Sequence, residues 1–264
     1  MKVLLLAGTA EARAIATGLS QDGRFKVIAS LAGATETPAD LGVETQSGGF
    51  GGAGGLRDFI AARGIDLLVD ATHPFAAQMK AHASAQAIPV LHVIRPAWTP
   101  RPGWTVCGSL AEAARALPAD ARAFLALGQR HLQAFADHPA QMLVRSVDAP
   151  SPAVAPGLDP GASAQTGRQG PRVKPEDSRR VARFTFIKGH PGTVAEETGL
   201  MRRHRITHLV CRNSGGRSGQ TKLDAAAQLG VRTIVIDRPP PPPGEIVPTA
   251  EAALDWCLRR RREG

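Results

Sequence analysis

A glycine-bearing turn follows the first apolar run of the sequence and could bind a phosphate group. The run LLL at residues 4–6 leads directly into AGTAE at residues 7–11, where a helix is expected to begin. The first backbone N–H groups of such a helix attract anions, and nucleotides bind at this position in doubly wound sheets. Only Gly8 remains of the usual GxGxxG glycines, so a plain tight turn is the alternative. The residues assigned to this site are Gly8, Thr9, Ala10 and Glu11.

The end of the second expected strand indicates which nucleotide would bind. NAD-specific sites usually place an acidic residue there to hold the ribose 2′-hydroxyl, but this chain has ASLAG at residues 29–33. A serine hydroxyl and the N–H groups of a small-residue turn can accept a 2′-phosphate without repulsion. The sequence therefore favours NADP over NAD, with Ser30, Ala32 and Gly33 as contacts, unless Ser30 merely ends a strand.

Six glycines fall within the eight residues 48–55, just before an expected helix. Such a density of glycine is typical of a backbone that approaches a ligand closely. We assign Gly48 and Gly49 to the cofactor site, with a mobile loop as the alternative.

The segment DATHPF at residues 70–75 follows the apolar run LLV. Pro74 lies near the start of the next helix, which places His73 at the carboxyl edge of the sheet, where open α/β sheets bind ligands. His73 is therefore a candidate for proton transfer and Thr72 a candidate cofactor contact, while a cap or turn role for His73 is the alternative.

The second half of the chain has similar polar exits from its strands. KGHPGT at residues 188–193, CRNSGG at 211–216 and RSVD at 145–148 each follow an apolar run. Cationic side chains at such exits could neutralise carboxylates or a phosphate. The candidates in this half are Arg145, Asp148, Lys188, Arg212, Asn213, Ser214 and Lys222.

Short Val-, Ile- and Leu-rich runs alternate with alanine-rich helical segments, which predicts parallel sheets covered by helices. Strands are expected at residues 2–6, 25–30, 66–70, 90–94, 122–126, 141–146, 183–187, 207–211 and 232–236. The clearest helices are expected at 9–20, 53–63, 75–87, 109–117, 192–204, 218–229 and 249–260. A proline cluster near residue 96 predicts two doubly wound domains, 1–96 and 97–264. Residues 149–180 are rich in Pro, Gly, Ala and Ser and are expected to be a flexible insertion, and a last short strand is expected at 245–247.

The bulk properties restrict the class of protein. The 264 residues carry a formal charge of +9, which favours an anionic partner. Nucleic acid is disfavoured because aromatic residues make up only 4% of the chain, with no tyrosine. Three cysteines without a CxxC pair indicate neither a disulfide framework nor a metal site. No apolar run is long enough to span a membrane, and a cytoplasmic protein is expected.

Five motifs taken in order resemble the precorrin-6A reductase family of cobalamin biosynthesis. They are LLLAGTAEARAIA, GGFGG, DATHPFA, KGHPGTVAEE and CRNSGGRSGQTKLDAA. The resemblance covers most of the chain apart from residues 149–180. It departs from the family at Ala7, where a second glycine is frequent, and at residues 189–191, where the family has Gly-Pro-Phe.

The resemblance implies two Rossmann-like α/β domains with the active site in the cleft between them. There, NADPH would reduce one double bond of an anionic tetrapyrrole, a precorrin. The protein would position the two and add a proton to the adjacent carbon, with Asp148 as first candidate donor and His73 as second. Arg145, Lys188, Arg212, Asn213, Ser214 and Lys222 would then serve the substrate carboxylates.

Three other interpretations stay open at this stage. Another NADP-linked oxidoreductase on the same scaffold would usually have a Tyr-x-x-x-Lys pair, which a chain without tyrosine lacks. A basic nucleic-acid-binding module and a regulatory nucleotide-binding protein without turnover are the others. The assembly is expected to be a monomer or a small homo-oligomer.

Overall fold

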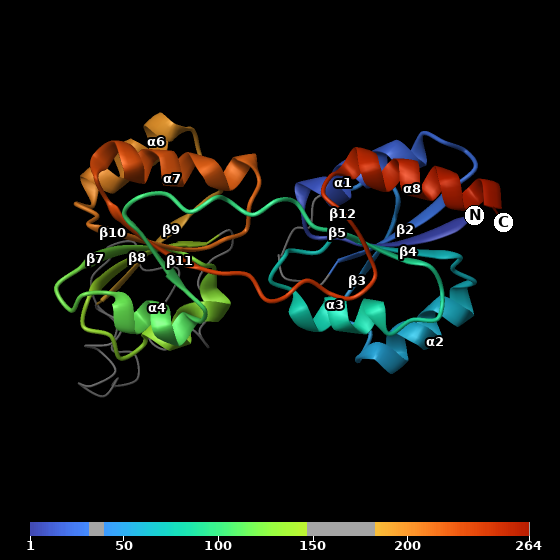
Figure 1. Ribbon diagram of the computed structural model, residues 1–264, viewed down its shortest axis with the longest axis horizontal. Helices are drawn as coiled ribbons and strands as arrows, with labels where there is room; N and C mark the ends of the chain where they lie inside the picture. Colours follow the sequence, from blue (N-terminus) through green and yellow to red (C-terminus); the bar gives the residue numbers. More distant parts are fainter. Residues whose placement is uncertain (32–39, 147–182, 264) are drawn as a thin grey trace, which may run out of the picture. The chain divides into compact units, whose positions relative to one another are not determined.

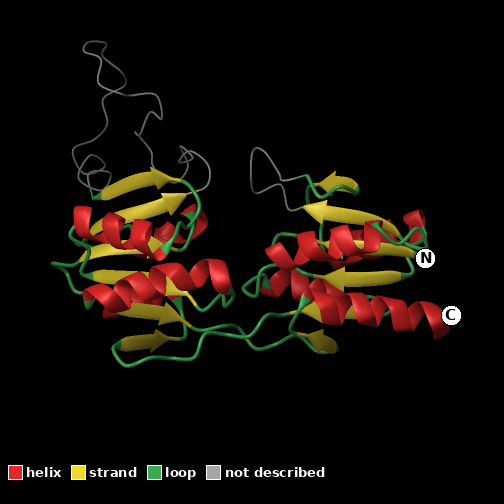
Figure 2. Cartoon of the chain, turned by 90° about the horizontal axis from the view of Figure 1, so that it is seen from above, coloured by secondary structure: helices red, strands yellow, loops and turns green. Residues whose placement is uncertain are grey.

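The computed structural model describes residues 1–31, 40–146 and 183–263, and the chain forms two compact units (Figure 1). The first unit contains residues 1–96 and 239–264, and the second contains residues 97–238. Each unit is built on a six-stranded sheet whose strand pairs are all parallel, so the arrows of each sheet run in one direction in Figure 2.

The first unit has the strand order of a Rossmann sheet. Its strand order is β12-β5-β4-β1-β2-β3. The chain builds the sheet outward from β1 to one side as far as β3 and then continues from β4 on the other side, so the point of reversal lies between β1 and β4. Its elements in chain order are β1 (Lys2–Leu6), α1 (Ala10–Ser20), β2 (Lys26–Leu31), β3 (Glu44–Ser47), α2 (Ala53–Arg63), β4 (Leu67–Asp70), α3 (Ala77–Ser84), β5 (Val90–Val93), β12 (Glu245–Val247) and α8 (Ala250–Glu263). In such sheets, ligands bind outside the carboxyl ends of the strands at the point of reversal.

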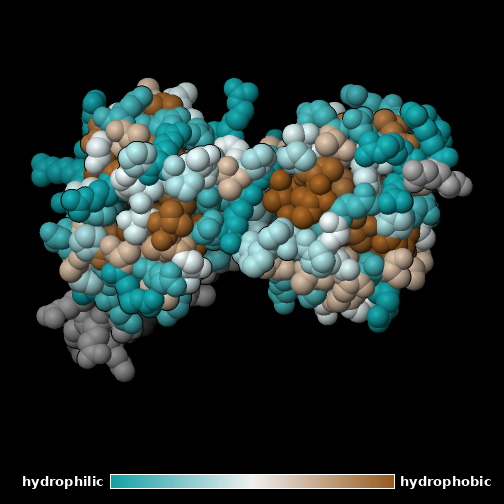
Figure 3. All heavy atoms as spheres, in the orientation of Figure 1, coloured by the Kyte–Doolittle hydropathy of each residue, from teal (hydrophilic) through white to brown (hydrophobic). Residues whose placement is uncertain are grey.

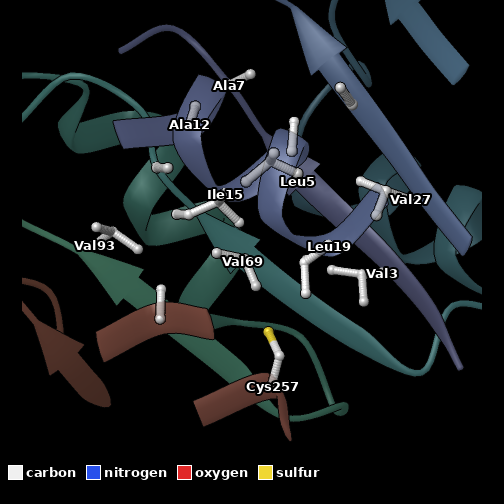
Figure 4. Packing of buried hydrophobic residues seen from close by; sticks show 14 of the residues in the cluster. Val3, Leu5, Ala7, Ala12, Ile15, Leu19, Val27, Val69, Val93 and Cys257 are labelled. Carbon is white, nitrogen blue, oxygen red and sulfur yellow. The ribbon is translucent and has the colours of Figure 1, made fainter. Parts of the chain in front are cut away.

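Both faces of the sheet are buried at β1, which is why its residues from Val3 to Leu6 are all apolar. Val3 and Leu5 face a cluster that includes residues of α1 and α8, shown in Figure 4, whereas Leu4 and Leu6 face a cluster that includes residues of α2 and α3. This two-sided burial holds the carboxyl end of β1 rigidly where the glycine turn begins.

The second unit repeats the same sheet order from different parts of the chain. Its order is β6-β11-β10-β7-β8-β9, and the reversal falls between β7 and β10. Its elements are β6 (Trp104–Cys107), α4 (Leu110–Ala116), β7 (Arg122–Ala126), the 3-10 helix η1 (Gln129–Phe135), β8 (Gln141–Ser146), β9 (Phe184–Lys188), α6 (Val194–Arg203), β10 (His208–Arg212), α7 (Arg217–Leu229) and β11 (Arg232–Ile236).

The predicted extent of the second domain, 97–264, is wrong at its C-terminal end. After β11 the chain returns to the first unit, where β12 pairs with β5 through Ile246 and His92, and α8 buries Trp256 and Cys257 in the first core. The sixth strand of the first sheet therefore comes from the end of the chain. In the same way, β6 is the sixth strand of the second sheet although it precedes the other five.

The expected strands and helices are otherwise present, with ends shifted by a few residues. The sequence reading missed β3 and β6, which are short edge strands of mixed polarity, and η1. Residues 149–180 lie outside the described residues.

Exposed apolar side chains occur on both of the sixth strands. Ile246 of β12 is 42% exposed and Val106 of β6 is 49% exposed. Figure 3 shows hydrophobic residues at the surface over β5 and β12. Among the helices of the described chain, none is long and apolar enough to cross a bilayer.

Candidate active site

The turn after β1 has the geometry of an anion-binding helix start. Gly8 has φ +149°, a conformation that strongly favours glycine, and a Cβ placed on it would meet nothing within 4 Å. Thr9 caps α1 by accepting from the Ala12 N–H at 3.2 Å. Within the described chain, the N–H groups of Ala10 and Glu11 have no hydrogen-bond acceptor. This open, donor-rich turn fits the pyrophosphate of a dinucleotide.

Hydrogen bonds join this turn to the other loops at the carboxyl edge. The Ala7 N–H donates to the Ser30 carbonyl at 2.8 Å, and the Thr9 hydroxyl donates to the Ala71 carbonyl at 2.8 Å. The Gly48 N–H donates to the Leu31 carbonyl at 3.0 Å. The structure thus brings together the segments that carry the predicted cofactor residues Gly8, Thr9, Ala10, Glu11, Ser30, Gly48, Gly49 and Thr72. Ala32 and Gly33 lie outside the described residues.

The glycine-rich loop before α2 requires glycine at three of its positions. Gly48, Gly51 and Gly52 have φ of +110°, +74° and +109°, which other residues rarely adopt. No atom lies within 4 Å of a Cβ built on Gly49, so its surroundings are open.

A buried charge cluster supports the loop that carries Thr72 and His73. Asp70 is fully buried and accepts from Lys80 Nζ at 2.9 Å and from His92 Nδ1 at 2.8 Å. Its other oxygen accepts from the Thr72 hydroxyl at 2.6 Å. Burial alone raises the pKa of Asp70, but the hydrogen bond from His92, the charge of Lys80 and the hydrogen bond from Thr72 lower it to about 2. Asp70 is therefore an anion that holds Lys80, His92 and Thr72 together.

His73 lies beside this cluster on the same loop. Its Nδ1 accepts from the Phe75 N–H at 3.3 Å, and its ring lies 5.8 Å from that of Phe75. His73 is half-buried, and its role in proton transfer stays a prediction.

In the second unit, Arg212 and Ser214 leave β10 at the point of strand reversal. Arg212 Nη1 lies 3.0 Å from His131 Nε2, and burial lowers the pKa of its guanidinium. Lys188, at the end of β9, is exposed. These residues lie at the carboxyl edge of the second sheet, as the sequence predicted.

Asn213 and Lys222 hold Trp98, a residue that the sequence analysis did not select. The Asn213 amide accepts from the Trp98 N–H at 2.8 Å and donates to the Trp98 carbonyl at 3.2 Å. Lys222 is buried, with Nζ 5.1 Å from the centre of the indole ring. Arg238 also donates to the Asn213 carbonyl at 2.7 Å. Asn213 thus fixes two segments next to the unit boundaries, and its contact with a substrate stays a prediction.

Arg145 is paired with a buried acid. Its Nη1 lies 2.8 Å from Glu197 Oε1, and its guanidinium lies 5.1 Å from the centre of the Phe124 ring. The Gly192 N–H donates to the same Glu197 oxygen at 2.9 Å. This pairing orients Arg145 at the end of β8. Asp148 lies outside the described residues.

Sequence reasoning missed Lys80, His92, Glu197 and Trp98. The burial of Lys80 and Glu197 could not be predicted from residue type, because Lys and Glu are usually exposed, and His and Trp occur both inside and at the surface. The signal that could have found Lys80 is its position ten residues after Asp70, on the helix that covers β4. In the described ranges, no group of three or more His, Cys, Asp or Glu side chains could hold a metal ion.

A Rossmann strand order, a turn at the point of reversal that suits an anion, and a second sheet with cationic strand exits are typical of a dinucleotide-binding enzyme. A model of the family described as "Precorrin-6x reductase CbiJ/CobK" matches residues 2–258. The chain belongs to this family, whose enzymes act in cobalamin biosynthesis. Because the family consists of reductases, a nicotinamide cofactor is implied.

Individual relatives agree with this assignment over nearly the whole chain. The chain is 40% identical to a precorrin-6A reductase of Rhodococcus erythropolis, with 98% of this chain and 99% of the relative covered. It is 38% identical to a precorrin-6A reductase of Rhodobacter capsulatus, with 97% and 95% covered. A solved structure of a CobK precorrin-6A reductase superposes with a TM-score of 0.82 at 35% identity, covering 98% of this chain and 96% of that chain.

Proposed function

We propose that this chain reduces one double bond of precorrin-6A with NADPH as the reductant, giving precorrin-6B. The observation that carries the cofactor half is the open turn at Gly8, whose helix N–H groups lie at the reversal of a Rossmann-ordered sheet. NADPH, when bound, supplies a hydride to the macrocycle. The protein binds and orients both molecules and delivers a proton to the neighbouring carbon.

The cofactor contacts follow from the order of the loops. The pyrophosphate would lie on the α1 turn formed by Gly8, Thr9, Ala10 and Glu11, and the adenosine half would lie over the end of β2. β2 ends in Ser30 and Leu31 without an acidic residue, so nothing in that strand end repels a 2′-phosphate. This supports NADPH over NADH, with Ala32 and Gly33 as further contacts.

The substrate contacts would come from the second unit. A precorrin carries several acetate and propionate groups, and a chain of charge +9 attracts such an anion. Arg212, Lys188, Ser214 and the oriented Arg145 are the proposed partners of these carboxylates, together with Asn213 and Lys222. The three cysteines are free and buried, which supports our placing of the reaction in the reducing cytoplasm.

Oxidation of NADPH, followed by absorbance in the presence and absence of precorrin-6A, tests this function. We expect NADPH oxidation only with the tetrapyrrole, and much slower oxidation of NADH. A protein that binds NADPH without turnover would instead be the regulatory alternative. Affinity for nucleic acid at physiological salt would favour the basic-module alternative.

One substitution can show whether Asp148 acts as the proton donor or only binds a ligand. Asp148→Asn is expected to lower turnover about tenfold or more with NADPH affinity unchanged, because only proton transfer is lost. His73→Gln is the comparison for the second candidate. Normal turnover in Asp148→Asn would remove Asp148 from the mechanism.

The ion pair between Arg95 and Glu11 predicts a second effect. Glu11 lies in the first turn of α1, where a pyrophosphate would bind, and Arg95 Nη1 lies 2.9 Å from its carboxylate. We expect Arg95→Ala to raise the Kd for NADPH about fivefold, because the Glu11 charge would then repel the phosphates. The double variant Arg95→Ala/Glu11→Gln should restore most of the affinity.

Fluorescence titration with NADPH measures these affinities. Arg57→Ala, an exposed arginine on α2, is the matched control and should bind NADPH normally. If the double variant binds no better than Arg95→Ala, Arg95 does not act through Glu11.

A further inference from the structure

The Asp70 cluster places three ionisable side chains almost entirely out of contact with water. Asp70 and His92 have no exposed surface, and Lys80 is 4% exposed. Burying such groups is costly unless each finds a partner, and an apolar core would often be as stable. The cluster therefore calls for a role beyond holding the fold.

The cluster extends from the candidate cofactor loop to the returning chain. Asp70 contacts Thr72 at one end, and His92 Nε2 lies 2.9 Å from Ser84 Oγ at the other. Ser84 in turn donates to the carbonyl of Pro243, just before β12. The segment that brings in the sixth strand is thus attached to the same cluster as Thr72.

The chain of Asp70, His92 and Ser84 has the order of a hydrolase triad, but the surroundings do not fit one. His92 has no exposed surface, and the Ser84 hydroxyl is engaged with the Pro243 carbonyl. A nucleophile needs an approach for its substrate and a base that can reach it. The cluster is more consistent with positioning than with covalent chemistry.

The hydrogen bonds at Thr72 determine what its hydroxyl can bind. The Thr72 hydroxyl donates its only proton to Asp70 Oδ1 at 2.6 Å, and Lys80 Nζ donates to it at 3.4 Å. Toward solvent, the half-buried hydroxyl can therefore act only as an acceptor. An acceptor suits a sugar hydroxyl or an amide N–H, and it does not suit a phosphate oxygen.

The place of Thr72 in the sheet indicates which end of the dinucleotide it meets. In a Rossmann sheet the adenosine half lies over β2 and the dinucleotide crosses the point of reversal between β1 and β4. The loop after β4 therefore lies on the side of the nicotinamide half. That half offers ribose hydroxyls and a carboxamide N–H.

We propose that Asp70, with Lys80 and His92, is a positioning residue that fixes the Thr72 hydroxyl as an acceptor for the nicotinamide riboside half of NADPH. This inference rests on the proposed function. It adds Asp70, Lys80 and His92 as the residues that direct the Thr72 hydroxyl, and it assigns the contact of this hydroxyl to the nicotinamide end of the cofactor.

Two ligands of the same site separate this role from a general loss of structure. Thr72→Val should raise the Kd for NADPH about fivefold, because one acceptor is lost. The Kd for adenosine 2′,5′-bisphosphate, which lacks the nicotinamide riboside, should not change. Thr72→Ser keeps the hydroxyl and should bind NADPH better than Thr72→Val. Thr45→Val, on β3, is the matched control for the loss of a hydroxyl.

Asp70→Asn tests the positioning step itself. Its effect on the Kd for NADPH should not add to that of Thr72→Val, because both act through one hydroxyl. Circular dichroism of each variant establishes that it is folded, and the Thr72 variants decide the question if Asp70→Asn unfolds. Equal losses for NADPH and for the bisphosphate in Thr72→Val would overturn the proposal. So would unchanged binding of NADPH, whereas a wild-type protein that binds no NADPH would refute the proposed function instead.

Discussion

Asp70→Ala is expected to lower the free energy of unfolding of the first unit by about 3–5 kcal/mol. The substitution leaves Lys80 buried without the carboxylate that lies 2.9 Å from its Nζ, and an uncompensated buried charge carries a penalty of this size. It also removes the acceptor of His92 Nδ1. Urea denaturation followed by circular dichroism measures the change. Asp22→Asn is the matched control, because the Asp22 carboxylate pairs with Arg24 at the surface and should contribute far less.

The same residue predicts how stability depends on pH. The folded-state pKa of Asp70 is about 2, below its ordinary value of 3.8, so the unfolded chain takes up the proton first as the pH falls. The stabilisation from Asp70 is therefore complete above about pH 4 and is lost as the pH falls through about 2. It should amount to about 2 kcal/mol. Asp70→Asn should lack this part of the pH dependence, and a wild-type-like acid profile in that variant would contradict the assignment.

The central strands of both sheets could be predicted because their composition follows from burial on two faces. The runs at β1, β4 and β10 each have an apolar centre with polar residues only at their ends, since the middle of each strand is covered by helices on both sides. The edge strands β3 and β6 are less buried and of mixed composition, so no periodic pattern marks them.

The return of the chain to the first sheet through β12 could not be predicted from local patterns. The strand at residues 245–247 was expected, but its partner was not, because pairing with β5 depends on contacts between residues about 150 positions apart. The position of Trp98 also depends on contacts with residues far away in the sequence. The indole lies against Gly219, where a Cβ would be 2.5 Å from the ring, and only the folded chain shows why that glycine is needed.

The candidate site was predictable in its loops and less so in its supports. Gly8, Thr9 and the segment at 70–75 stand out because glycine, capping and polar residues directly follow apolar strands. The partners that orient them, Lys80 and His92, lie on a helix face and within a strand. Their residue types do not distinguish them from ordinary surface residues, and only the spacing of Lys80 from Asp70 gives a signal.

Gly55→Ala is expected to lower the free energy of unfolding by about 3 kcal/mol, whereas Gly54→Ala should stabilise the chain by up to about 1 kcal/mol. A Cβ on Gly55 would lie 1.7 Å from the Phe50 carbonyl oxygen, so the glycine-rich loop has to move. Phe50 packs edge-on against Phe59 with ring centres 5.2 Å apart, and that contact would be disturbed. At Gly54 the nearest atom is the end of the Arg57 side chain, at 3.7 Å, and alanine favours the helix.

The pair of variants also tests whether the loop belongs to the cofactor site. Because Gly48 and Gly49 precede the clash and are proposed to approach NADPH, Gly55→Ala should weaken NADPH binding even at temperatures where the variant is folded. Gly54→Ala should bind NADPH normally, since its backbone can stay in place. Urea denaturation and NADPH titration of both variants give the comparison. Normal NADPH affinity in a folded but destabilised Gly55→Ala would mean that the glycines serve the turn alone, and Gly48 and Gly49 would then leave the site.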